Sequence, residues 1–273
     1  MLKRIVSLRP SIVVLAASSL MLAACQGEDR APTPAPVPTP APTPAVTVAP
    51  APTLDRAGLL QAMDLAASAY AAGDETFDAA LVGRRFLVRQ AFGCVEGAEA
   101  SAGGAGVTRS TDGLTLKLEM TPGDWTASPP FPGANGDWEA AEGVWLSWPW
   151  LRAETCPAGS GRAAVEEGAS RGSPSPQTMG LAGVFDEDGS RLGRRNGRPY
   201  AFTMRGEGGL PPVSAPGGYR LVLEGRLVAF SDGRAVRCHA SGLDQRPVCL
   251  GAVRMERVAF ETAEGQLISE WRG

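Results

Sequence analysis

Histidine and lysine are scarce in this sequence. The 273 residues contain one histidine, His239, and only one lysine, Lys117, after position 25. The chain also has no Cys-x-x-Cys pair, no His-Glu-x-x-His motif and no phosphate-binding loop. Zinc sites, zinc proteases and nucleotide-binding loops need those residues at those spacings. We therefore expect that the protein binds no metal and no cofactor. No residue stands out from the sequence as catalytic.

The chain also has no excess of positive charge. Its 26 basic side chains face 29 acidic ones. Three of the basic residues, Lys3, Arg4 and Arg9, belong to a segment that we expect to be removed. The remainder then carries 23 basic and 29 acidic side chains, a net charge of −6. Such a balance argues against nucleic acid as a partner, because nucleic-acid binding needs a basic surface.

The N-terminal segment 1–24 has the pattern of a secretory signal. Its basic residues precede an apolar run at 12–24 that is too short to span a bilayer, which takes about 20 apolar residues. The run ends in Leu22-Ala23-Ala24-Cys25. This ending resembles the lipobox of bacterial lipoproteins. The resemblance implies cleavage before Cys25, acylation of that residue, and attachment to a membrane through the lipid.

The residue after the lipobox cysteine is Gln26. In Gram-negative lipoproteins an Asp at this position retains the protein at the inner membrane. The resemblance therefore implies an anchor in the outer membrane, on either its periplasmic or its surface face.

Residues 25–53 form a lipidated terminus followed by a linker. From position 31 the linker consists almost entirely of Pro, Ala, Thr and Val. Proline at nearly every second position prevents helix and sheet formation and favours an extended chain. We expect a disordered, semi-rigid tether that reaches about 70 Å at ~3.1 Å per residue. A proline-rich ligand for a partner domain is the alternative.

The remaining 220 or so residues carry the signals of a mainly β fold. Apolar residues at helical spacing predict one N-terminal helix over 55–72, which Thr53 or Asp55 caps. After it, alternating patterns predict strands at 86–92, 114–120, 200–204 and 219–223. Turn residues predict hairpins between 226–230 and 234–238, and between 253–261 and 266–271. We expect an antiparallel sandwich or a small barrel.

A Gly-, Ser- and Pro-rich stretch at 157–177 divides this region. Long structureless loops are uncommon inside compact domains. We therefore expect either an exposed loop or a boundary between a helix-plus-β subdomain at 54–165 and a β subdomain at 166–273.

Four cysteines remain once Cys25 is set aside, and an even number in an exported chain predicts disulfides. Three pairings are open. We favour Cys94 with Cys156 and Cys238 with Cys249, because the second pair closes a short Gly- and Pro-containing loop.

Tryptophan is concentrated in one segment, since five of the six lie within residues 125–150. Trp148 and Trp150 would share one face of a strand there, and Trp145 would point to the other. Tryptophan serves cores and binding surfaces alike. The rings either form the core of the first half or present Trp145, Trp148 and Trp150 as a binding surface for glycan or peptide.

These observations favour a non-enzymatic, membrane-anchored envelope lipoprotein with a β-rich binding or structural domain. The main alternative is a cell-wall module that binds peptidoglycan through the Trp-rich segment. A third is an envelope hydrolase that uses paired carboxylates. The chain has many Asp and Glu residues, but no motif identifies two of them as a catalytic pair.

Overall fold

The computed structural model describes residues 51–74, 79–94, 99–130, 138–157 and 176–273. Cys25 and the Pro-rich segment up to residue 50 lie outside these ranges, so the lipobox and the tether remain predictions. Among the described residues, no helix is both long enough and apolar enough to cross a bilayer.

The predicted helix is present as α1 (Arg56–Ala72). Its N-cap is Asp55, whose carboxylate accepts a hydrogen bond from the main-chain N–H of Gly58 at 2.7 Å. Gly73 ends the helix in the left-handed conformation, where a residue without a Cβ is unstrained. The helix buries Leu59, Leu60 and Met63 against the strands.

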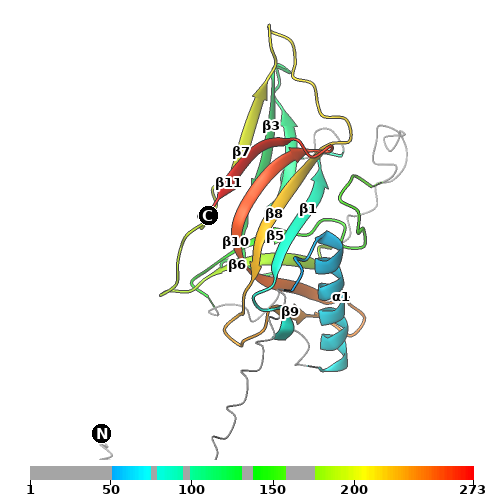
Figure 1. Ribbon diagram of the computed structural model, residues 1–273, viewed down its shortest axis with the longest axis vertical. Coiled ribbons are helices and arrows are strands. Elements are labelled where there is room, and N and C mark those ends of the chain that lie inside the picture. The colour runs from blue at the N-terminus through cyan, green and yellow to red at the C-terminus, as the bar shows by residue number, and fades with distance from the viewer. Residues whose placement is uncertain (1–50, 75–78, 95–98, 131–137, 158–175) are drawn as a thin grey trace, which may run out of the picture. The chain divides into compact units, whose positions relative to one another are not determined.

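The strands form two sheets, as a mainly β sandwich requires (Figure 1). The larger sheet has the order β1-β8-β10-β6-β5-β4, and β9 and β11 also pair with β10. Its strands are β1 (Arg85–Phe92), β4 (Gly123–Asp124), β5 (Ala140–Trp145), β6 (Met179–Phe185), β8 (Tyr219–Leu227), β9 (Val236–His239), β10 (Val248–Thr262) and β11 (Leu267–Arg272). A single 3-10 turn, η1 (Ala79–Leu81), precedes β1.

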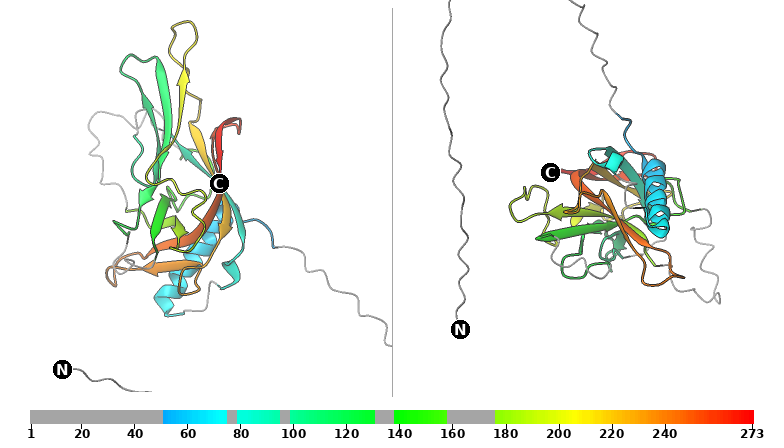
Figure 2. Two further views of the ribbon diagram at one scale, coloured as in Figure 1. Left: turned by 90° about the vertical axis from the view of Figure 1, so that its left-hand side faces the viewer. Right: turned by 90° about the horizontal axis from the view of Figure 1, so that it is seen from below.

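The smaller sheet has the order β2-β3-β7. It consists of β2 (Gly104–Arg109), β3 (Thr115–Thr121) and β7 (Tyr200–Arg205). Figure 1 and the left view of Figure 2 show the two sheets as separate layers. One core of buried side chains joins them, because Leu116 and Leu118 of β3 pack in the same cluster as Phe86 and Phe260. Over the residues that the structure describes, the sheets do not close into a barrel.

Two details differ from the sequence expectation. β6 runs parallel to β10, so the large sheet is mixed rather than wholly antiparallel. The turn predicted at 231–233 forms, with the N–H of Gly233 bonded to the carbonyl of Phe230. However, β9 pairs with β10 and not with β8, so the predicted hairpin partners were wrong. Turn residues indicate where a chain reverses, but not which strand it then joins.

Both sheets contain strands from before and after residue 165. β5 pairs with β6, and β3 pairs with β7. Residues 54–165 and 166–273 therefore contribute to the same two sheets. The segment that separates them in the sequence, 158–175, is outside the described residues.

The strand β10 changes neighbours along its length. Val253 has β6 on one edge and β8 on the other. From Arg257 onward the edge that β6 occupied is taken by β11. Between these pairings the register with β8 shifts at Met255/Arg257. We call residues 254–256 of β10, where β6 and β11 part, the fork.

Candidate binding cleft

A cavity of about 250 Å³ lies at the fork. It is bounded by the ends of β5 and β6, by β10, and by residues of the smaller sheet. Its apolar walls include Met120, Val144, Val184, Leu192, Val253, Met255 and Val258. A concave, mostly apolar site with a few polar groups is the usual form of a small-molecule pocket.

A second cleft of about 210 Å³ adjoins the first. The two share Leu192, Gly193, Tyr200, Met255 and Val258. The second is more polar, since Arg194, Arg195, Arg257 and Arg272 line it together with Glu256. The segment Leu192–Gly193 therefore lies along both clefts.

Two carboxylates beside β5 hold this segment in place. Both carboxylate oxygens of Glu142 lie 2.9 Å from the main-chain nitrogen of Arg195, and one accepts from Asn196 N–H at 2.6 Å. Asn196 is in the left-handed region, with φ 52°. Glu139 forms ion pairs with Arg191 at 2.7 Å and with Arg194 at 3.4 Å. The loop after β6 is thus fixed to β5 by charge-assisted hydrogen bonds.

Tyr200 forms a further wall where the clefts meet. The residue is 8% exposed, and the guanidinium of Arg195 stacks over its ring at 4.5 Å from the ring centroid. Its other neighbour is Trp271, which packs edge-on at 5.3 Å. Burial raises the pKa of the Tyr200 phenol, so the ring is neutral near pH 7.

The predicted tryptophan set divides into buried and exposed members. Trp125 and Trp138 are buried in a second core beside Phe230. Trp145 packs on Trp125 with ring centroids 4.7 Å apart. Gly143 makes this possible, because a Cβ there would overlap the ring of Trp125.

The predicted strand does not reach the other two rings. β5 ends at Trp145, and Trp148 adopts φ 47° in a turn, so the expectation that Trp148 and Trp150 share a strand face was wrong. Trp150 is 63% exposed. Of the three proposed binding residues, it is the one that presents most of its surface to solvent.

The turn that carries Trp148 is held from the helix by a residue that the sequence reasoning missed. Arg56 is 2% exposed and donates hydrogen bonds to the carbonyl oxygens of Ser147, Trp148 and Leu151. Burial lowers its pKa to about 10, with an opposing contribution from Glu154, so it stays charged near pH 7. No sequence motif distinguishes this arginine from the others.

Both predicted disulfides are confirmed. Cys94 is bonded to Cys156, and Cys238 to Cys249. The second joins residues that face each other directly in the β9–β10 register.

The residues that a serine hydrolase with a histidine or lysine base would need are spread over the fold. His239 is on β9, and Lys117 is on β3 of the other sheet, where it forms an ion pair with Glu119. In the part of the chain that is described, no group of three His, Cys, Asp or Glu residues could hold a metal ion. The letters Gly-x-Ser-x-Gly occur at 168–172, outside the described residues. A nucleophile elbow needs a strand before the serine and a helix after it.

No protein-family model matches the chain, and none of the curated proteins or solved structures compared with it is similar.

Proposed function

We propose that this protein is an outer-membrane lipoprotein, anchored through Cys25, whose β domain binds a small, mainly apolar ligand without catalysing a reaction. The observation that carries the proposal is the cavity at the fork. It has apolar walls, and its loop is fixed by Glu139 and Glu142, so the site is formed before any ligand arrives. The two disulfides support an oxidising compartment, which is where a lipoprotein domain of the envelope resides.

The ligand site is tested with the neutral probe N-phenyl-1-naphthylamine, whose fluorescence rises in apolar surroundings. The unaltered chain should enhance the signal. Met255→Trp should abolish the enhancement, because Met255 lines both clefts and is half-buried. Met204→Trp is the matched control, since Met204 is also half-buried but lines neither cleft. Absence of enhancement with the unaltered chain would refute the cavity as a ligand site.

A peptidoglycan-binding surface is the second candidate, and Trp150 is the observation that favours it. An exposed indole next to half-buried Trp148 offers an aromatic face to a sugar ring. Retention on purified peptidoglycan should then fall in Trp148→Ala and Trp150→Ala. Leu243→Ala serves as the control, because Leu243 is fully exposed in another loop. If the unaltered protein is not retained, this candidate fails.

A further inference from the structure

We infer that the cavity at the fork takes a small amphipathic anion, with an aliphatic body inside and an anionic head group on Arg254. The inference rests on the proposed function, since it assigns a chemical class to the ligand of that same site. Three observations carry it: the walls of the cavity, the state of Arg254, and the charge of the neighbouring sheet face.

The walls suit a flexible aliphatic body. Valine and methionine dominate them, and methionine adapts its shape to what it contacts. With ~30 Å³ for each water-sized group, the cavity holds about eight heavy atoms. That matches a short alkyl chain with its first head-group atom and is too small for a full-length lipid tail.

Arg254 lines the cavity and is the cation available to a head group. Its side chain is exposed and forms no ion pair or hydrogen bond within the described parts of the chain. In the β8–β10 register it lies directly opposite Arg226, another arginine. Like charges in that position repel. Glu256 does not neutralise Arg254, because its carboxylate forms ion pairs with Arg226 and with Arg85, each at 3.0 Å.

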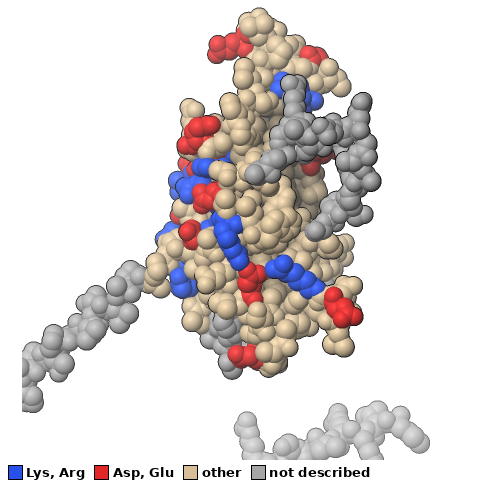
Figure 3. Space-filling view, turned by 90° about the vertical axis from the view of Figure 1, so that its right-hand side faces the viewer, with Lys and Arg blue, Asp and Glu red and all other residues tan. Residues whose placement is uncertain are grey.

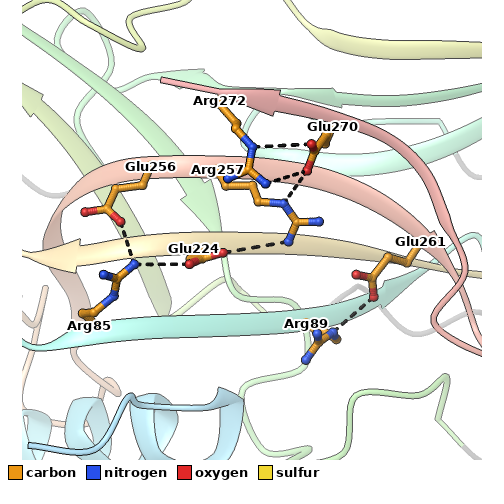
Figure 4. Close-up of polar contacts among 8 residues, drawn as sticks. All are labelled: Arg85, Arg89, Glu224, Glu256, Arg257, Glu261, Glu270 and Arg272. Atoms are coloured by element: carbon orange, nitrogen blue, oxygen red, sulfur yellow. Dashed lines mark hydrogen bonds and ion pairs between the residues drawn. The ribbon is translucent and has the colours of Figure 1, made fainter.

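The sheet face around Arg254 has more cations than anions. On β1, β8, β10 and β11, seven residues form a charged ladder, most of which Figure 4 shows: Arg85, Glu224, Arg226, Glu256, Arg257, Glu270 and Arg272. Adding Arg254 gives five guanidinium groups against three carboxylates. This local surplus contrasts with the chain's net charge of −3. In Figure 3, basic and acidic side chains lie intermixed along one side and across the lower part of the face shown, and most of that face is uncharged.

Two carboxylates, Glu142 and Asp186, also line the cavity. They differ in whether other groups of the protein already bind them. Glu142 is already occupied by the main-chain N–H groups of Arg195 and Asn196. Asp186 is exposed on the turn after β6. Its charge opposes a bound anion, so removing that charge should strengthen binding. Removing the charge of Arg254 should therefore weaken the binding of an anionic ligand, whereas removing the charge of Asp186 should strengthen it.

The test uses the full chain, produced without acyl groups and with its disulfides formed, in NMR titrations with three probes. Sodium octanoate has both body and head, 1-octanol has the body alone, and sodium phosphate has an anionic head alone. Octanoate should bind most tightly and shift the amides of Val184 and Met255. Arg254→Gln should weaken octanoate about tenfold and leave 1-octanol unchanged. Asp186→Asn should strengthen octanoate.

Arg246→Gln is the control, because Arg246 is an exposed arginine that pairs with Asp64 and lines neither cleft. If 1-octanol binds as tightly as octanoate, or if Arg254→Gln weakens both equally, the anionic head group is refuted while the cavity remains a ligand site. Phosphate binding as tight as octanoate binding refutes the apolar body. If neither octanoate, 1-octanol nor the neutral naphthylamine binds, the proposed function itself fails.

Discussion

Arg56, the first residue of α1, lies against the main-chain carbonyl oxygen of Trp148, 92 positions further along the chain, with a nitrogen–oxygen distance of 3.2 Å. The same guanidinium nitrogen donates to Ser147 at 2.6 Å. One buried guanidinium thus donates hydrogen bonds to the carbonyl groups of a turn that is not part of a strand. The position of the exposed Trp150 depends on this contact, because Trp150 lies within the turn that the N–H of Leu151 closes onto the carbonyl of Trp148.

Replacing Arg56 should therefore destabilise the protein strongly. Arg56→Ala removes the side-chain donor from the partly buried carbonyls of Ser147, Trp148 and Leu151 and leaves a cavity in place of a buried side chain, and we expect a loss of about 3 kcal/mol in the free energy of unfolding. Chemical denaturation measures it. Arg246→Ala is the exposed control and should cost less than about 1 kcal/mol. Equal effects of the two variants would contradict the structural role of Arg56.

The effect of replacing a tryptophan on stability should depend on how deeply its ring is buried. Trp125 is 4% exposed and packs on Trp145, so Trp125→Ala should cost about 3–5 kcal/mol of stability. Trp150 is 63% exposed, and Trp150→Ala should change stability by no more than ~0.5 kcal/mol. Thermal unfolding of both variants checks this. A large loss in Trp150→Ala would show that its ring packs against the fold.

The two disulfides should differ in their contribution. Cys94–Cys156 joins residues 62 apart and Cys238–Cys249 joins residues 11 apart. On the loop-entropy account, the first contributes about 4 kcal/mol and the second about 3 kcal/mol. Denaturation of the paired Cys→Ala variants measures each. Peptide mapping without reductant should recover these two linkages, and any other pairing would contradict the structure.

The ladder on the large sheet should give a measurable pKa change. A hydrogen bond from Arg257 at 2.8 Å is the largest single cause that lowers the pKa of Glu270, and Arg272 lowers it further through its charge and a hydrogen bond. Arg257→Gln should raise the pKa of Glu270 more than Arg272→Gln does, as carboxyl NMR titration would show. A carboxylate with a lowered pKa in the fold stabilises it above its unfolded pKa of about 4.3, and that contribution is lost as the pH falls through the folded value. Identical titrations of Glu270 in both variants would contradict this assignment.

The anchor is tested by Cys25→Ala. If Cys25 is the acylated residue, the variant should lose incorporation of labelled palmitate and should no longer fractionate as an acylated membrane protein. Cys94→Ala with Cys156→Ala is the control, because those thiols are bonded to each other and should not affect labelling. Continued labelling of Cys25→Ala would overturn the lipoprotein proposal.

The sequence predicted what depends on local order along the chain. Helix α1 and its caps follow from the residues at its ends and from the spacing of its apolar face. β3 follows from the alternation of Leu116, Leu118 and Met120 with polar residues. The disulfide pairing followed from an even number of cysteines and one short loop. These features depend on residues close together in the chain, or on a choice among very few partners.

Only the tertiary structure decided how distant segments meet. The parallel pairing of β6 with β10, the fork, and the cavity beside it arise from a change of strand neighbours that no periodicity records. The roles of Arg56 and Arg254 were invisible for the same reason. Each is one arginine among many, and its neighbours come from segments far away in the chain. Whether a charge is buried, paired or free is set by packing, because solvation depends on what surrounds the group in space.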